Sequence, residues 1–110
     1  MKRFDDTTLT PERAASAFAA LGSEQRLSVL QTLVRAGHEG LAIGELGTRT
    51  GVTGSTLTHH LKILTAAGLV EQAKHGRSII CAAVAYTEIE ALSTYLLANC
   101  CADIKDDKNG

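Results

Sequence analysis

Two adjacent cysteines, Cys100 and Cys101, are the residues of this 110-residue chain whose types and spacing most directly suggest chemistry. They end the run LLANCC, where the pattern predicts the last turn of a helix. Successive helical residues point about 100° apart, so both side chains cannot face one core. Their Cα atoms lie about 3.8 Å apart, which is shorter than the span of a relaxed disulfide. The pair is therefore predicted to be two thiols, whose soft sulfurs suit trivalent arsenic, antimony and thiophilic metals.

A second candidate site consists of small polar side chains on a helix predicted over residues 54–67. Its buried stripe is Leu57, Leu61 and Leu64. Burial of that stripe leaves exposed, near the start of the helix, the residues Ser55, Thr56, Thr58, His59 and Lys62. Hydroxyl and imidazole groups can contact base edges, and a lysine one turn later can contact a phosphate.

Two basic residues accompany that helix at the tip of a predicted β-hairpin. Lys74 and Arg77 flank Gly76 between two apolar-rich runs, LVEQA and SIICAAVA. A hairpin tip of this kind is well placed to contact DNA phosphates, so both residues join the predicted DNA-binding set.

The charge distribution favours DNA binding more than the total charge does. The chain has a net charge of −1 and a pI of about 6.4, far from the pI above about 9 that marks an obviously basic domain. Residues 49–78, however, hold four Lys or Arg against one Glu, a formal charge of +3, and three histidines. Acidic residues gather towards the two ends of the chain.

The order of predicted elements indicates a mainly α fold with a β-hairpin wing. Helix starts are predicted at Thr10-Pro11, at Ser23 and at Thr53, and a short helix from about Ile43 ends at Gly51. Thr87-x-x-Glu90 resembles a capping box that opens the last helix, with Cys100 on its apolar stripe. Helix, helix, helix-turn-helix, hairpin and helix make a winged helix-turn-helix, in which residues 54–67 form the recognition helix.

The motifs LGSEQRLSVL, STLTHHLKIL, AGLV and HGRSII together resemble the ArsR/SmtB family of bacterial winged-helix repressors over roughly residues 13–101. The resemblance implies a homodimer formed through the first and last helices. It also implies repression of an operon until a metal ion, metalloid or thiol-reactive signal releases the protein from DNA. The apolar faces of AASAFAAL and of the last helix agree with a two-fold partner.

The family resemblance narrows the effector site to the cysteine pair. One known family site needs cysteines on the short helix, which here reads IGELGTRTG, and another needs histidines after His75, where none occurs. Some arsenic-responsive members carry a vicinal pair like Cys100-Cys101, often with a further cysteine, but no thiol follows Cys101. Two sulfurs favour a methylated trivalent arsenical, or inorganic arsenite or antimonite with a borrowed third ligand.

Cys81 leaves an alternative open. It is predicted as a partly buried residue of the strand just before the last helix. The length of that helix puts Cys81 about 20 Å from Cys100. A redox or persulfide sensor would pair Cys81 with Cys100 or Cys101, although the negative end of a helix dipole disfavours thiolates. An interaction module without an effector is a further alternative. His60 is predicted to pack beside the buried stripe, and His38 and His75 are assigned no site.

We therefore predict a DNA-binding repressor that a trivalent arsenical at Cys100 and Cys101 releases from its operator. Its dimer would place two recognition helices on an inverted repeat with half-sites about 10 bp apart, or a multiple of that. No nucleophile–base pair or phosphate loop suggests an enzyme. The absence of a signal-like or membrane-spanning run predicts a cytoplasmic protein. The predicted domain covers residues 10–102, between disordered segments 1–9 and 103–110.

Overall fold

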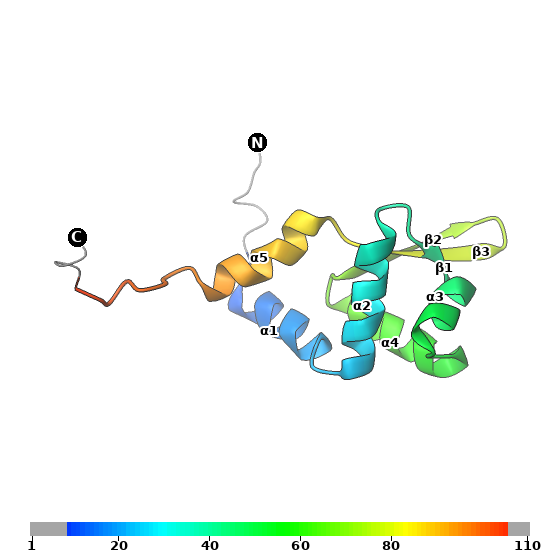
Figure 1. Ribbon diagram of the computed structural model, residues 1–110, viewed down its shortest axis with the longest axis horizontal. Helices are drawn as coiled ribbons and strands as arrows, with labels where there is room; N and C mark the ends of the chain where they lie inside the picture. The colour runs from blue at the N-terminus through cyan, green and yellow to red at the C-terminus, as the bar shows by residue number, and fades with distance from the viewer. Residues whose placement is uncertain (1–8, 106–110) are drawn as a thin grey trace.

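The computed structural model describes residues 9–105, so the disorder predicted for residues 1–8 and 106–110 lies outside the described residues. The described chain forms five helices and one three-stranded antiparallel sheet, arranged as a winged helix-turn-helix (Figure 1). In chain order the elements are α1 (Pro11–Ala20), α2 (Glu24–Ala36), β1 (Leu41–Ala42), α3 (Ile43–Thr50), α4 (Gly54–Ala66), β2 (Val70–His75), β3 (Ser78–Ala83) and α5 (Tyr86–Leu96). The predicted fold class is confirmed.

Local capping chemistry sets the starts of the first two helices. The Thr10 hydroxyl accepts a hydrogen bond from the backbone N–H of Arg13 at 3.1 Å, and Pro11 occupies the first helical position. The Ser23 hydroxyl accepts in the same way from the N–H of Arg26 at 3.3 Å. Each hydroxyl satisfies one of the N–H groups that the first helical turn leaves free.

The helix-turn-helix and the wing follow from glycines at tight turns. Gly51 ends α3 with φ 75°, a left-handed conformation that glycine adopts without steric cost. Gly76 has φ 64° in the two-residue turn that pairs His75 with Ser78, which suits a twisted hairpin. Strand β1 was not predicted from the sequence. It is only two residues long and pairs with β3, so that the strand order is β1-β3-β2.

The core lies between α2, α3, α4 and the sheet. Its fully buried side chains are Val29, Leu33, Leu46, Leu61, Leu64 and Cys81. Leu57, Leu61 and Leu64 of α4 are all buried, as the stripe predicted. Burial of this one face fixes which side of α4 remains exposed, since the helix has a single apolar stripe.

The last helix differs from its prediction at both ends. It begins at Tyr86 with Ala85 as the N-cap and without a side-chain cap, so the predicted Thr87–Glu90 capping box is wrong. It ends at Leu96, and residues 97–103 form a run of turns that includes Cys100. Cys100 is therefore exposed beyond the helix and does not lie on its apolar stripe. Of the residues of α5, only Leu92 is buried.

Within the described part of the chain, no helix combines the length and the apolar character needed to cross a bilayer.

Candidate DNA interface and thiol pair

The solvent-facing side of α4 carries the recognition residues predicted from the sequence. Ser55, Thr56, Thr58, His59 and Lys62 are all exposed. The Thr58 hydroxyl donates to the carbonyl oxygen of Gly54 at 3.3 Å, so its remaining capacity for a base is as an acceptor. These residues share one face because the opposite face of α4 is packed in the core.

The start of α4 offers polar groups beyond the predicted DNA-binding residues. Thr53 is the N-cap, as predicted, but its exposed side chain makes no capping hydrogen bond. A shallow groove between α3 and α4 begins beside it and is lined by Ile43, Gly44, Gly47, Thr48, Thr53, Gly54, Leu57 and Thr58. The uncapped N–H groups and the positive end of the helix dipole favour an anion at this end of α4.

The wing presents its basic residues to solvent. From Glu71 to Ile79 every residue of the hairpin is exposed, which includes Lys74 and Arg77. The structure thus places both predicted phosphate contacts around the turn at Gly76. Neither side chain is committed to the core, so both are available to a ligand.

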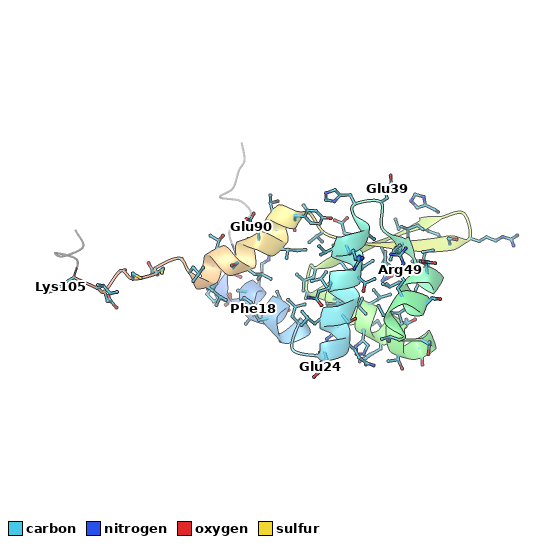
Figure 2. All side chains as sticks on the ribbon, in the orientation of Figure 1. Phe18, Glu24, Glu39, Arg49, Glu90 and Lys105 are labelled. Carbon is cyan, nitrogen blue, oxygen red and sulfur yellow. The ribbon has the colours of Figure 1, made fainter. Side chains whose placement is uncertain are left out.

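Arg49 contributes less to the basic surface than its charge suggests. Its Nε donates to Glu45 Oε2 at 2.9 Å, an exposed i,i+4 ion pair on α3 (Figure 2 labels Arg49). Glu45 lies just outside residues 49–78, so the formal charge of +3 for that segment includes Arg49 but not its acidic partner. The free positive charge of the interface therefore comes mainly from Lys62, Lys74 and Arg77.

His60 is a packing histidine, as predicted, and it joins α4 to α2. Its Nε2 lies 2.8 Å from Gln25 Oε1, and its Nδ1 lies 3.3 Å from Arg26 Nη1. Burial, followed by repulsion from Arg26 and His59, lowers the pKa of His60 below its ordinary value of 6.5. The lowered pKa favours the neutral ring. Its two contacts direct the ring of His60 towards α2.

The remaining histidines differ in their surroundings. His38 stacks on Tyr86, with ring centroids 4.5 Å apart. The Tyr86 hydroxyl donates to the carbonyl oxygen of Val34 at 3.0 Å. These two contacts tie the start of α5 to the end of α2, which is a structural use of His38. His75 is exposed in the wing.

The two vicinal thiols lie together in solvent. The Sγ atoms of Cys100 and Cys101 are 3.4 Å apart, and both side chains are exposed. Cys101 has φ 64°, the left-handed region that residues other than glycine rarely occupy. Among residues 9–105, no three His, Cys, Asp or Glu side chains form a cluster that could hold a metal ion. Within residues 9–105, the chain therefore supplies two sulfurs at this site and no third ligand.

Cys81 lies in a different environment from the pair. It is fully buried on the central strand β3, opposite Leu41 of β1 and Gln72 of β2. Burial raises the pKa of Cys81, which disfavours the reactive thiolate. Its packing explains the residue without any sensing role.

The wing and the segment that holds the two thiols occupy opposite ends of the molecule, and α4 lies between them (Figure 1). Figure 1 shows α3 and the wing at one end, and α1, α5 and the chain that follows α5 at the other. Figure 2 places Lys105 far along that following segment, on the side away from Arg49. Any influence of the thiols on DNA binding must therefore pass through the body of the protein or through a partner.

Comparison with known proteins agrees with the geometry. A family model described as a helix-turn-helix domain matches residues 21–73. An uncharacterized HTH-type transcriptional regulator of Bacillus subtilis (strain 168), YceK, is 36% identical over 78 residues, which are 71% of this chain and 72% of that protein.

Solved structures share the fold. An ArsR-like transcriptional regulator from Rhodococcus sp. RHA1 superposes with a TM-score of 0.66 at 33% identity, covering 84% of this chain and 82% of that one. A homodimeric winged helix-turn-helix DNA-binding domain from Mycobacterium bovis superposes with a TM-score of 0.66 at 22% identity, covering 79% and 78%. The exposed face of α4, the basic wing and these relatives lead to one conclusion: the chain belongs to the ArsR-like family of winged helix-turn-helix transcriptional regulators.

Proposed function

We propose that this protein is a dimeric repressor that binds an inverted-repeat operator and leaves it when a trivalent arsenical bridges Cys100 and Cys101. The observation that carries the effector assignment is the pair of exposed thiols with sulfurs 3.4 Å apart. The exposed polar face of α4 and the basic wing support the DNA-binding part of the proposal.

The DNA contacts divide by chemistry into base-reading and phosphate-binding residues. Ser55, Thr56 and His59 present short hydrogen-bonding groups near the start of α4, where recognition helices meet base edges in the major groove. Lys62, Lys74 and Arg77 carry the charge that would neutralise phosphates. The first group would set sequence preference and the second would set affinity.

Dimerisation is supported by apolar side chains that a single chain leaves in solvent. Leu96 and Leu97 at the end of α5 are 67% and 60% exposed, and Phe18 of α1 is 37% exposed. The homodimeric domain from Mycobacterium bovis has the same fold. A two-fold partner would bury these side chains and would fix the spacing of two α4 helices.

The thiol pair fits a soft trivalent centre. The two sulfurs are 3.4 Å apart. If one central atom bonds both at about 2.3 Å, the length of a zinc–thiolate bond, the angle between the two bonds is about 95°. A pyramidal trivalent arsenic accepts such an angle without moving either sulfur. Each thiol would lose its proton and displace one hydroxyl of the arsenical, so that two sulfur–arsenic bonds form and two water molecules leave.

The number of sulfurs favours a singly methylated arsenical over inorganic arsenite. A methyl group occupies one of the three bonds of arsenic and leaves two for Cys100 and Cys101. Inorganic arsenite or antimonite would need a third ligand, and no such residue joins the pair among the described residues of one chain.

A redox or persulfide switch that uses Cys81 is less well supported. Cys81 is fully buried and its pKa is raised, so its thiol is both shielded and protonated. Cys100 and Cys101 belong to the segment that follows α5, and Figure 1 shows this segment on the opposite side of the molecule from the sheet.

The experiment is release of a labelled duplex, selected from a random library, by methylated arsenite, inorganic arsenite, antimonite and zinc. We expect methylated arsenite to release the unchanged protein, and Cys100→Ser and Cys101→Ser each to abolish release while DNA binding persists. Cys81→Ser is the matched control and should respond normally.

Three outcomes would contradict parts of this proposal. If all three variants responded normally, the vicinal pair would not be the effector site. If Cys81→Ser alone lost the response to every arsenical, a switch that uses Cys81 would replace the two-thiol site. If Cys81→Ser lost only the response to inorganic arsenite, Cys81 would be the third ligand that a partner subunit supplies.

A further inference from the structure

We propose that Arg26 and His60 are positioning residues that set the rotation of α4 about its own axis, and thereby the ability of the protein to discriminate its operator from other DNA. The inference rests on the proposed use of α4 as the recognition helix. It adds a pair of residues that touch no base and act through the orientation of that helix.

Arg26 makes two directed hydrogen bonds to two different elements. Its Nε donates to the carbonyl oxygen of Ala20 at 2.6 Å, at the last residue of α1. Its Nη1 donates to His60 Nδ1 at 3.3 Å, on α4. The planar guanidinium fixes the angle between its donors, so Arg26 relates α4 to the end of α1 with a geometry that lysine cannot reproduce.

The protonation pattern of His60 follows from its partners. A guanidinium has no acceptor, so Nδ1 of His60 must accept from Arg26, and the ring proton must lie on Nε2. That Nε2–H donates to Gln25 Oε1 at 2.8 Å. Both ring nitrogens are thus used, and the ring is held by two adjacent residues in the first turn of α2.

We call the bonded set of Arg26, His60 and Gln25 the clamp. It lies on the side of α4 that faces away from the proposed DNA contacts. His60 is 9% exposed, whereas His59, the preceding residue, is exposed among the predicted base contacts. With side-chain tips about 6 Å from the helix axis, a 20° rotation of α4 moves each tip by about 2 Å. Hydrogen bonds to base edges do not survive such a shift, whereas long, flexible Lys62 and Arg77 can still reach phosphates.

The clamp also gives α4 a contact with the dimer-forming end of the molecule. Ala20 ends α1, the helix whose exposed Phe18 belongs to the proposed dimer face. A groove between α1 and the second half of α4 runs past Arg26 and is lined by Ser16, Ala19, Ala20, Arg26, Ile63, Ala66 and Ala67. Beside this groove, Arg26 links the two helices through its bonds to Ala20 of α1 and His60 of α4.

The test measures specific and non-specific DNA affinity for three substitutions at one position. His60→Asn can keep an acceptor near the position of Nδ1 and so keep the bond from Arg26. His60→Gln instead keeps a donor for Gln25 and loses the bond from Arg26. His60→Leu loses both bonds. Affinities for the selected operator and for a scrambled duplex are compared at a temperature at which circular dichroism shows each variant folded. Arg26→Lys completes the set.

We expect the ratio of specific to non-specific affinity to fall about tenfold in His60→Leu, His60→Gln and Arg26→Lys, which corresponds to about 1.4 kcal/mol. His60→Asn should retain most of the ratio. The salt dependence should not change in any of the four, because no phosphate contact is lost. A purely structural role would lower thermal stability without this selective loss, and equal ratios in His60→Asn and His60→Gln would overturn the inference.

Thr56→Ala separates failure of this inference from failure of the proposed function. Thr56 is exposed on α4 and lies outside the clamp. If Thr56→Ala lowers the ratio and His60→Leu does not, the positioning role is wrong while DNA reading by α4 stands. If neither changes the ratio, α4 is not the recognition helix and the inference falls with it.

Discussion

Removal of the guanidinium at the tip of the wing should weaken DNA binding in a manner that depends on salt and not on sequence. Arg77 is exposed in the turn between β2 and β3. Its assigned partner is a phosphate, which carries no sequence information. Arg77→Ala should therefore reduce affinity for the operator and for a scrambled duplex by the same factor.

The size of the effect follows from counterion release. Each phosphate contact contributes about 0.9 to the slope of log K against log salt concentration, so a dimer with two wings loses about 1.8. Over a fourfold rise from about 50 to about 200 mM salt, the affinity of the unchanged protein should fall about twelvefold more than that of Arg77→Ala.

The assay is fluorescence anisotropy of the two labelled duplexes across a salt series. Arg35→Ala is the matched control, because Arg35 is an exposed arginine in the last turn of α2 and lies outside the predicted DNA-binding set. Its slope should equal that of the unchanged protein. If Arg77→Ala altered base preference and left the slope unchanged, the wing would read bases, and the assignment of Arg77 to a phosphate would be refuted.

Further predictions concern assembly, the core and pH. Sedimentation at micromolar concentration should give a dimer, and Leu97→Glu should shift it towards monomer, because Leu97 is 60% exposed in one chain. Leu46→Ala should lower the free energy of unfolding in urea by about 2–5 kcal/mol, since Leu46 is fully buried. Gly40→Ala should destabilise the fold in the same assay, because Gly40 has φ +74° and a Cβ there would clash with the Cys81 carbonyl oxygen. The pKa of His60 is lowered in the folded state, so the unfolded chain binds more protons below about pH 6.5. Stability should therefore decline as pH falls from about 6.5 towards the lowered pKa, and His60→Asn should flatten this decline in denaturation curves taken at each pH.

The parts of the fold that the sequence predicts are those that local chemistry determines. Thr10, Pro11 and Ser23 mark helix starts because a side-chain oxygen or a fixed φ acts within three residues. Gly51 and Gly76 mark turns because their backbone conformations exclude most other residues. The apolar stripe of α4 separates its buried and exposed faces, which is why its candidate recognition residues could be named from spacing alone.

The errors concern elements whose limits depend on distant contacts. The start of α5 is held by contacts of Tyr86 with Val34 and His38, about fifty residues away in the chain, and not by a local cap. Its end at Leu96 follows from the lack of packing, because Leu96 and Leu97 face solvent in a single chain. Short helices owe most of their stability to tertiary packing, so the periodic pattern alone extended α5 too far.

The candidate sites divide in the same way. The sequence located both thiols of the pair and the exposed face of α4, but it could not detect the contacts of Arg26 with His60, which join residues 34 positions apart. The sequence does show that His60 lies beside the buried stripe of α4. Such a position requires hydrogen-bond partners, although the sequence does not identify them.

The position of the thiols beyond α5 indicates how a small chemical event could reach a distant DNA interface. Leu97 and Ile104 flank the pair and are 60% and 63% exposed, so the same segment carries both the proposed effector site and apolar surface that a partner would bury. Full burial of one such side chain contributes about 1.5–3 kcal/mol, and allosteric coupling between two sites is typically about 1–3 kcal/mol. In the proposed dimer, an arsenical that holds the segment in a shape unable to bury Leu97 would therefore remove enough free energy to change operator affinity. The required change is the loss of about one buried leucine in each protomer, which a local rearrangement between Leu96 and Ile104 can supply while α4 and the wing keep their own structure.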